Sequence, residues 1–469
     1  MKVFRSSEFP DNSEELYWFY NGMDCAVTHE VYSALAADLR AGPCNVRATY
    51  DMSMRKSAPY MLMSLRGIRV DEGKRQRALF DLAKDHRILT RNFDLLCGEM
   101  FGKTVSAASW QQVAGLLYDD LGLPGRHLGT GEKQLNKLMD RTIAQPFIKH
   151  ILALRDANKQ TSNLNASLDN GRFYTLLSVA GTKTRRLSSR KSNFGFGGNA
   201  QNIDSRHRGM FIPDEGYVAV EIDLEQADSR NVGAIIYVFL DDASYLDFCE
   251  SGDLHTKIAE MAWPELPWPE DTRKYAESVG TNGAPQKDFQ LTIRQIAKKS
   301  GHGTNFRGGP REIGLQVNVP MHVVVAFQKR YYAAVPCIPD WHEWTQDQLE
   351  RYGQLTTLYG HQRDFHGRPD NQTLKQALSY QASSMTAHEI DHGVLAIFNN
   401  FEPEVQLLNQ VHDSVWFQMR EKHIDTLMPE ILGSMEHRMN LGGRDFCVPL
   451  EAMYGESWGK EDMQAFSAA

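Results

Sequence analysis

The feature that most constrains this chain is a strand that ends in an aspartate, within Tyr217–Arg230 (YVAVEIDLEQADSR). Val218, Val220 and Ile222 alternate with Ala and Glu, which predicts a strand with one buried face. The pattern stops at Asp223, and a polar run follows. A carboxylate at the end of a buried strand is costly unless it meets a cation or a hydrogen-bond donor. We therefore expect Asp223 to have a chemical partner.

A second stretch of the same kind lies far down the chain, at Leu407–Met419 (LLNQVHDSVWFQM). Its two apolar runs flank His412-Asp413, which predicts a hairpin with Asp413 at its tip. Two strand-end carboxylates brought together repel each other, so such a site favours divalent cations. Two-metal phosphoryl transfer needs this arrangement, because one ion activates the attacking oxygen and the other stabilises the leaving oxygen.

The length and composition are those of a globular protein of several domains. The chain has 469 residues, 42% of them hydrophobic and 23% charged, which suits about three domains. Its six Cys residues include no CxxC pair, which argues against a zinc finger or a disulfide framework and fits a reducing compartment. No apolar run approaches the roughly 18 residues of a membrane span, and the N-terminus has no apolar signal-peptide core. We expect a cytoplasmic protein.

The net charge of −8 argues against a protein that simply coats a polyanion, although a local basic groove can still steer nucleic acid in an acidic protein. The densest basic cluster, Lys183–Lys191, contains no acidic residue. It is either a solvated loop or a phosphate-backbone contact, and its position just before the Asp223 strand favours the contact.

The coarse pattern predicts an α+β protein. A turn at Asn21-Gly22 is expected before a first helix, and few strand signals occur before residue 170. Strands and loops are mixed over 170–232, and 233–380 returns to helix. Helices are predicted over 24–40, 58–65, 73–101, 110–121, 146–168, 381–399 and 422–441, with a last strand over 448–453.

One predicted helix carries a basic stripe. Arg294, Lys298 and His302 are spaced i, i+4, i+8 and therefore share one helix face. Two cations and an imidazole on one stripe suit a triphosphate with a base above it. The alternative is a solvated basic face.

Taken together, these segments resemble a known family. The Asp223 strand, the Arg294–Phe306 helix and the Gln410–Asp413 hairpin occur in the order of the three polymerase motifs of family A DNA polymerases, the bacterial polymerase I class and its phage relatives. Thr184–Ser189 with Gln201-Asn202-Ile203 resembles the family's template-primer-contacting run. Asp253-Leu254-His255 resembles the family's early fingers motif, and residues 65–71 resemble the start of its thumb. The similarity covers about residues 15–460.

The resemblance implies a right-hand polymerase with an antiparallel-sheet palm, helical fingers and a helical thumb. The implied division is 1–54 for a segment resembling the tail of an exonuclease domain, 55–168 for the thumb, 169–232 and 381–469 for the palm, and 233–380 for the fingers. The implied activity is template-directed, primer-dependent DNA synthesis from dNTPs with release of pyrophosphate, in phage or plasmid-like replication or repair. The implied partners are primer-template DNA and dNTPs, with no membrane.

The resemblance also assigns roles residue by residue. Asp223 and Asp413 would bind two Mg²⁺ ions, and Lys298 could protonate the pyrophosphate leaving group. The residues implied to contact the dNTP are Arg294, Lys298, His302, Phe306, His255, Gln226 and Asp228. The residues implied to contact DNA are Arg186, Lys183, Arg190, Gln201, Asn202, Gln381, Gln410 and His412.

Three positions depart from the family pattern. Ser414 stands where the family has a Glu after the hairpin Asp, and Asp228 stands where it has a Glu. His302 replaces an aromatic residue that stacks on the incoming nucleotide. These changes bear on fidelity and sugar selection more than on catalysis.

The N-terminal segment is a further departure. Tyr20–Asp24 resembles the last motif of the family's 3′→5′ exonuclease, but only 19 positions precede it, too few for the earlier motifs. We expect an exonuclease domain that is absent or on another chain, so a separate exonuclease or replisome protein is a possible partner. The alternative for Asp24 is a helix N-cap after the predicted turn.

Other readings compete with polymerase. His388-Glu389-Ile-Asp-His392 matches HExxH, the helix of zinc metallopeptidases. Leu395 and Phe398 stand where the longer form of that motif has a glycine and a third histidine. A non-catalytic DNA-binding protein with a polymerase fold would be favoured by loss of a metal-binding Asp, and both are present. A single-subunit RNA polymerase shares the palm plan, but the run over 184–203 resembles the DNA enzyme more.

Overall fold

The computed structural model describes residues 13–42, 44–286 and 290–467. The first twelve residues, where a signal-peptide core is not expected and where the exonuclease-like segment begins, lie outside these ranges. At the centre is a five-stranded antiparallel sheet with the order β14-β13-β6-β10-β9. Its strands are β6 (Val218–Leu224), β9 (Val405–Val411), β10 (Ser414–Met419), β13 (Leu450–Gly455) and β14 (Met463–Ala465). The expected α+β class with an antiparallel sheet is confirmed.

The register of the sheet places the predicted hairpin beside the predicted strand. β10 pairs with both β9 and β6, and Ser414 lies opposite Asp223. On the other side of β6, Glu451 of β13 lies opposite Asp223. The end of β6 is therefore flanked by the tip of one strand pair and by a second acidic residue.

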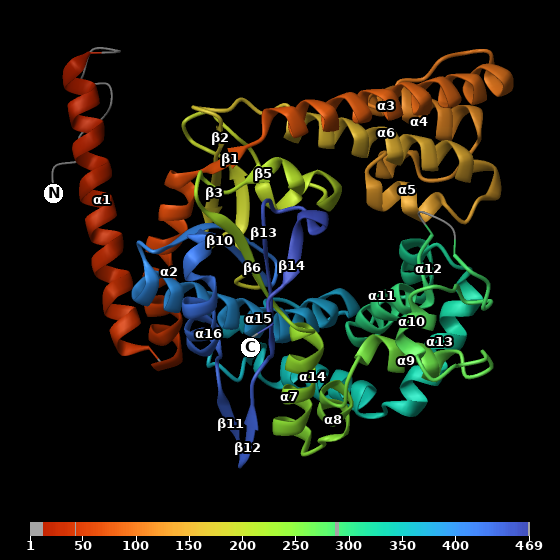
Figure 1. Cartoon of the computed structure of the whole chain (residues 1–469). Helices are drawn as coiled ribbons and strands as arrows, with labels where there is room; N and C mark the ends of the chain where they lie inside the picture. Colours follow the sequence, from red (N-terminus) through yellow and green to blue (C-terminus); the bar gives the residue numbers. More distant parts are fainter. Residues whose placement is uncertain (1–12, 43, 287–289, 468–469) are drawn as a thin grey trace.

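Long helices cover the sheet and supply the largest apolar core. α15 (Asn371–Phe401) contacts β9 and β10, and α2 (Cys44–Arg66) contacts both α15 and β9. Met385 and Val394 of α15 belong to the same buried cluster as Val220 and Phe417 of the sheet. α16 (Ile424–Met435) packs on α15 from outside, as Figure 1 shows. The sheet thus packs on a layer of helices.

Two helical lobes lie on the same side of this centre (Figure 1). The first has its own core, which includes Phe93, Leu117, Phe147 and Ile151. It is built from α3 (Glu72–Phe101), α4 (Trp110–Ala114), α5 (Glu132–Leu138) and α6 (Gln145–Leu164). The second lobe comprises α7 (Ala227–Leu240), α8 (Ser244–Glu250), α9 (Leu254–Ala262), α10 (Thr272–Ala276), α11 (Ile293–Asn305), α12 (Pro310–Val317), α13 (Met321–Ala334) and α14 (Cys337–Tyr352).

The tips of the two lobes touch. Arg311, in α12, donates a hydrogen bond to Asp140 at 2.8 Å, two residues beyond α5. This contact joins α5 of the first lobe to α12 of the second, and α5 lies above α12 in Figure 1.

The N-terminal helix differs from the prediction. α1 (Glu14–Ala41) begins ten residues before Asp24, and the expected turn at Asn21-Gly22 lies inside it. Ser13 caps the helix by accepting a hydrogen bond from the Leu16 amide, and two glutamates follow in the first turn, where the helix dipole favours them. The N-cap interpretation of Asp24 is therefore wrong. α1 ends before Gly42 as expected, and Pro43 lies outside the described ranges.

Other helix boundaries moved for local reasons. The helix predicted over 58–65 is the end of α2, and the one over 381–399 is part of α15, which starts at Asn371 after the Asp370 cap. The segment 110–121 begins after Ser109 as expected but becomes π-helical over 115–120. The helix predicted over 146–168 ends at Leu164, and that over 422–441 ends at Met435.

Short strands complete the fold. They are β1 (Ile68–Val70), β2 (Arg172–Phe173), β3 (Thr175–Ser178), β4 (Ser188–Lys191), β5 (Phe211–Ile212), β7 (Gln354–Thr356), β8 (Gln362–Asp364), β11 (Met439–Leu441) and β12 (Arg444–Phe446). None of the helices in the described ranges has both the length and the apolar character needed to cross a bilayer.

Candidate active site

The two strand-end aspartates lie at one edge of the central sheet. Asp223 is near the end of β6, and Asp413 lies in the two-residue turn between β9 and β10. His412 enables this tight turn by adopting a positive φ of 55°, a region that most non-glycine residues avoid. The Leu224 amide donates to the Asp413 carbonyl at 3.1 Å. The hairpin tip is thereby tied to the end of β6, as the sequence predicted.

The pKa values of both Asp223 and Asp413 are raised, as expected for two buried carboxyl groups that lie close together without a bound cation. Burial, followed by the charge of Asp413, raises the pKa of Asp223 to about 8, and Lys298 acts in the opposite direction. Burial also raises the pKa of Asp413. Two carboxyl groups that resist ionisation side by side gain the most from a bound cation.

An open cavity of about 210 Å³ lies in front of the pair. Its wall includes two carboxylates that the sequence reasoning did not select, Glu221 and Glu451. Glu221 accepts hydrogen bonds from the Ser414 hydroxyl at 3.0 Å and from the Trp458 indole at 3.1 Å. Ser414, which stands at the family's Glu position, therefore contacts a carboxylate on the neighbouring strand. The period of the strand could have found Glu221, because it shares a face with Asp223.

Arg208 is a second lining residue that the sequence reasoning missed. Its guanidinium lies 4.5 Å from the centre of the Trp458 ring, and it lines the same cavity. This contact joins segments about 250 residues apart, so no local sequence pattern could have indicated it.

The basic stripe is present on α11. Ile293, Ala297 and Ser300 are buried on the opposite face, while Arg294, Lys298 and His302 face away from the core. Thr292 and Gln295 form a capping box at the start of the helix, which fixes where the stripe begins. The predicted common face is confirmed.

Arg294 is held by a neighbouring acid. Its Nε and Nη2 donate to the two carboxylate oxygens of Asp253, each at 2.8 Å. Burial raises the pKa of Asp253, but hydrogen bonds from Arg294 and Thr256 outweigh burial and bring the value down to about 2. This ion pair fixes the position of the guanidinium relative to the short helix α9.

His255 lies behind the stripe. Only 8% of its surface is exposed. Burial, followed by the nearby charges of Lys298 and Arg294, lowers its pKa to about 3. The ring is therefore neutral at physiological pH and can offer one donor and one acceptor.

The two rings at the C-terminal end of α11 pack on each other. His302 and Phe306 meet edge to face, with 4.8 Å between ring centres. Phe306 also packs edge to face on Trp341 of α14, with 6.3 Å between the ring centres. His302 is exposed and Phe306 is half-buried, so the outer ring faces the open space and the inner ring supports it.

Asp228 is held by hydrogen bonds from two other segments. Arg186 donates to both of its oxygens, at 3.0 and 3.1 Å, and the Thr386 hydroxyl donates to one of them at 2.8 Å. The neighbouring Arg230 does not take part in this pairing. Arg230 instead lies 3.6 Å from Glu225. Thr386 was missed because it sits inside α15 with no distinguishing motif.

Gln226 precedes Asp228 at the start of α7. It adopts a positive φ of 57° and donates to Glu225 at 2.9 Å. Its side-chain oxygen is buried without a hydrogen-bond partner. The turn therefore keeps one unused acceptor close to Asp228.

Three of the residues expected to contact DNA gather under the hairpin tip. Gln201 donates to the Gln410 carbonyl at 3.0 Å, and Gln410 donates to the His412 carbonyl at 2.7 Å. Gln381 is buried and accepts from the Trp341 indole at 2.9 Å. Gln201 and Gln410 thus support the hairpin tip, whereas Gln381 links α15 to α14, and His412 is exposed.

Three other expected DNA contacts have exposed side chains. Lys183 lines a separate hollow of about 310 Å³ together with Arg363 and Lys375. Arg190 on β4 and Asn202, which follows Gln201, are exposed. None of these three residues lines the cavity in front of the aspartate pair.

The HExxH segment forms structural contacts. His388 shares a hydrogen bond of 2.8 Å with His361, and Glu389 accepts from Asn231 at 3.0 Å and from Tyr359 at 2.8 Å. The ring of His392 packs on His437 instead. Within residues 13–42, 44–286 and 290–467, no group of three or more His, Cys, Asp or Glu side chains is arranged to hold a metal ion. The described contacts of the motif are thus hydrogen bonds and ring packing within the fold.

The chain is similar to known proteins. The model of DNA polymerase family A matches residues 83–460. DNA polymerase I of Helicobacter pylori (strain J99) is 24% identical over 423 residues, which are 85% of this chain and 42% of that protein. The thermostable DNA polymerase I of Thermus aquaticus is 25% identical over 429 residues, which are 86% of this chain and 47% of that protein. The chain thus spans less than half the length of these relatives.

A solved structure shares the fold. It is the POL domain of Pol1 from M. smegmatis, in a complex with DNA primer-template and dNTP. The TM-score is 0.67 at 21% sequence identity, and the match covers 87% of this chain and 70% of that chain. Since the family model extends over most of the sequence and includes both strand-end aspartates, the chain belongs to DNA polymerase family A.

Proposed function

We propose that this chain catalyses template-directed, primer-dependent DNA synthesis, joining dNTPs to a primer 3′-OH and releasing pyrophosphate. The observation that carries the proposal is the pair of Asp223 and Asp413, which line one cavity at the edge of the sheet, with Lys298 of α11 close enough to lower the pKa of Asp223. This combination of paired acids and a facing cation suits transfer of a nucleotidyl group.

The donor set fits magnesium. Mg²⁺ is usually bound through one or two carboxylates, with waters and substrate phosphates completing its coordination, and Asp223 and Asp413 supply two. When bound, a pair of such ions would activate the primer 3′-OH and stabilise the leaving oxygen. Glu221 lines the same cavity and keeps the site acidic although Ser414 replaces a family glutamate.

The α11 stripe would bind the triphosphate. Lys298, which is exposed, would lie along the phosphates and give a proton to the departing pyrophosphate. Arg294, oriented by Asp253, and neutral His255 would add donors. His302 would lie against the base, with Phe306 beneath it, and Gln226 and Asp228 would lie near the sugar.

The DNA would lie between the two helical lobes. Arg186 and the turn at His412 would approach the primer terminus, with Gln201, Gln381 and Gln410 bracing them. Lys183, Arg190 and Asn202 would contact the DNA backbone further out, and this binding would weaken as the salt concentration rises.

In this assignment the thumb is 55–168, the palm is 169–232 with 381–469, the fingers are 233–380, and 1–54 is a separate N-terminal segment. A separate exonuclease or replisome protein would supply proofreading in phage or plasmid-like replication.

Primer extension tests the proposal. The purified chain should extend a labelled primer on a template with dNTPs and Mg²⁺. Asp223→Asn and Asp413→Asn should each lower the rate by several orders of magnitude, because metal positioning acts mainly on the transition state. Binding of primer-template, measured by fluorescence anisotropy, should remain close to wild type. Near wild-type extension by either variant would contradict the proposal.

A further inference from the structure

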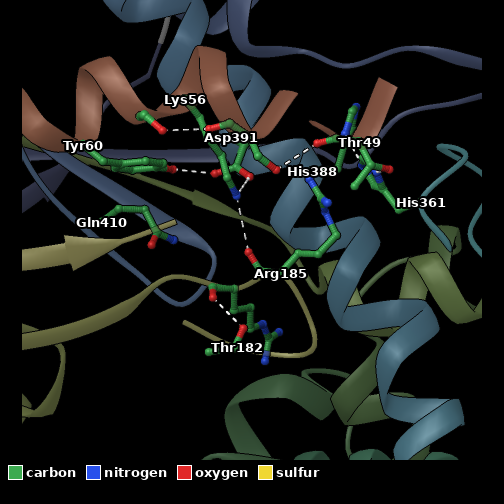
Figure 2. A network of polar contacts seen from close by, with 12 residues as sticks. Thr49, Lys56, Tyr60, Thr182, Arg185, His361, His388, Asp391 and Gln410 are labelled. Carbon is green, nitrogen blue, oxygen red and sulfur yellow. Dashed lines mark hydrogen bonds and ion pairs between the residues drawn. The ribbon is translucent and has the colours of Figure 1, made fainter. Parts of the chain in front are cut away.

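The most deeply buried cation among the described residues lies away from the aspartate pair. Lys56, on α2, has no solvent exposure. Its Nζ lies 2.6 Å from Asp391 of α15, and Tyr60 donates to the other oxygen of Asp391 at 2.6 Å. Figure 2 shows the three side chains converging between the two helices. The proposed reaction gives this cluster no role.

Lys56 has a second acceptor, which leads toward the site. Its Nζ lies 3.4 Å from the carbonyl oxygen of Arg185, a contact drawn in Figure 2. Arg185 has a positive φ of 65°, which is unusual for a residue with a long side chain and needs support from its surroundings. The next residue is Arg186, whose guanidinium holds Asp228.

The turn that carries Arg185 is closed from within as well. The Thr182 hydroxyl donates to the Arg186 carbonyl at 2.6 Å. This bond fixes the shape of the turn, but it does not fix where the turn lies relative to the helices. The hydrogen bond from Lys56 ties this backbone to α2 and, through Asp391, to α15.

Both members of the Arg186–Asp228 pair are therefore connected to α15 by hydrogen bonds. Thr386 of α15 donates to Asp228, and Asp391, just over one turn later on the same helix, holds Lys56 and thus the backbone before Arg186. A shift of α2 against α15 would move the arginine relative to its carboxylate. A buried ion pair is a poor source of stability, since apolar residues of similar size often replace one without loss.

We infer that Lys56, Asp391 and Tyr60 form a positioning cluster that sets the location of Arg186 at the primer terminus and beside Asp228. None of the three reaches the reacting atoms, and they act through the Arg185 backbone. The inference rests on the proposed polymerase function, and it adds residues before position 83, outside the segment that the family model matches.

A thermodynamic cycle tests the inference. We expect Lys56→Met to lower the rate of single-nucleotide addition by about tenfold, because small misplacement of a substrate-contacting group costs rate steeply. In an Arg186→Ala background the same substitution should change the rate by less than about twofold, since the group it positions is gone. Multiplicative, independent effects of the two substitutions would overturn the inference.

A paired substitution separates positioning from stability. Lys56→Met alone leaves Asp391 buried and unpaired, whereas Lys56→Met/Asp391→Leu removes both charges. We expect the double variant to regain thermal stability and to keep the slow rate. Recovery of the rate together with stability would show a purely structural role. If Lys56→Met fails to fold, the same cycle of single-nucleotide addition rates can be measured with the double variant or with Asp391→Asn, each with and without Arg186→Ala.

Arg66→Met is the matched control. Arg66 is at the end of the same helix and pairs with Glu402 at 3.0 Å, but it does not contact the 182–186 turn. Its loss should lower stability without coupling to Arg186→Ala. A wild-type chain that does not extend primers would refute the proposed function itself, whereas an active chain with uncoupled effects would refute only the role of the cluster.

Discussion

Arg186 donates hydrogen bonds to both carboxylate oxygens of Asp228, at 3.0 and 3.1 Å, across 42 residues of sequence. The Thr386 hydroxyl donates to the same carboxylate. The acid at the proposed sugar position is therefore held from two sides. An aspartate is one methylene shorter than the family's glutamate, so this fixed carboxylate leaves more room beside a ribose.

The first prediction concerns sugar choice. We expect measurable ribonucleotide incorporation by the wild-type chain, with deoxyribonucleotides still preferred. Asp228→Glu should strengthen the preference by about 10–200-fold, the usual range for one methylene of steric wall, and Asp228→Ala, which removes the carboxylate, should weaken it. Single-nucleotide kinetics with matched dNTP and rNTP would measure both. If neither substitution moves the preference, Asp228 is not the gate.

Control variants separate the effect of the size of the side chain at position 228 from the effect of its ion pair with Arg186. Asp228→Asn keeps the size but weakens the bond to Arg186. Thr386→Val removes one donor without changing shape, and Thr386→Ser restores it. An effect of Thr386→Val that Thr386→Ser does not repair would point to packing rather than to the hydrogen bond.

The sequence was sufficient for the parts of the site that depend on local periodicity. The alternation before Asp223 and the paired apolar runs around Asp413 each describe one strand, and the antiparallel sheet joined them. The stripe of Arg294, Lys298 and His302 needed only the pitch of a helix. Glu221 was within reach of the same reasoning and was overlooked because its partner, Ser414, comes from another strand.

Contacts between distant segments could not be predicted in this way. The partners of Asp228 lie in a loop 42 residues before it and in a helix 158 residues after it, and no spacing rule links such positions. The error at α1 was local, since Ser13 followed by two glutamates is itself a helix-start signal. The Asn21-Gly22 pair was given more weight than this cap, and the helix passed through it.

The second prediction concerns the exposed cation of α11. Lys298→Ala should lower the rate of nucleotide addition and weaken dNTP binding, because the ammonium group would serve both the triphosphate and the leaving group. Pre-steady-state kinetics over a range of dNTP concentrations would separate the two effects. Lys299→Ala, one position along and off the stripe, is the control and should change neither. Unchanged rate and affinity in Lys298→Ala would mean that this lysine is only solvated.

The third prediction concerns pH and stability without metal. The folded protein holds the Asp223 proton more tightly than the unfolded chain does, with a pKa of about 8 against an ordinary value of 3.8. The stability from this shift is complete at low pH and is lost as pH rises through about 8. The free energy of unfolding in urea with a chelator should therefore fall as the pH rises from about 6.5 to about 8, and it should level off above pH 8.

Two comparisons isolate that effect. The buried His255 shifts in the opposite direction, to a pKa of about 3, so its contribution to the slope ends near pH 6.5. Asp223→Asn should flatten the slope between pH 6.5 and pH 8, and Mg²⁺ should stabilise the wild type more at pH 9 than at pH 6, because a bound cation favours the ionised pair. An equal slope in wild type and Asp223→Asn would contradict the pKa assignment.

The last prediction concerns nuclease activity. Asp24, which resembles a residue of the family's exonuclease, is exposed on α1, a helix with no buried residue. Metal-dependent cleavage needs carboxylates gathered in a shaped cavity, and an isolated exposed acid does not provide one. A labelled, mismatched primer incubated with this chain and Mg²⁺ but no dNTP should keep its length. The Asp24→Ala variant should behave identically. Shortening that Asp24→Ala abolishes would make Asp24 an active residue, and shortening that survives it would reveal a nuclease site elsewhere in the chain.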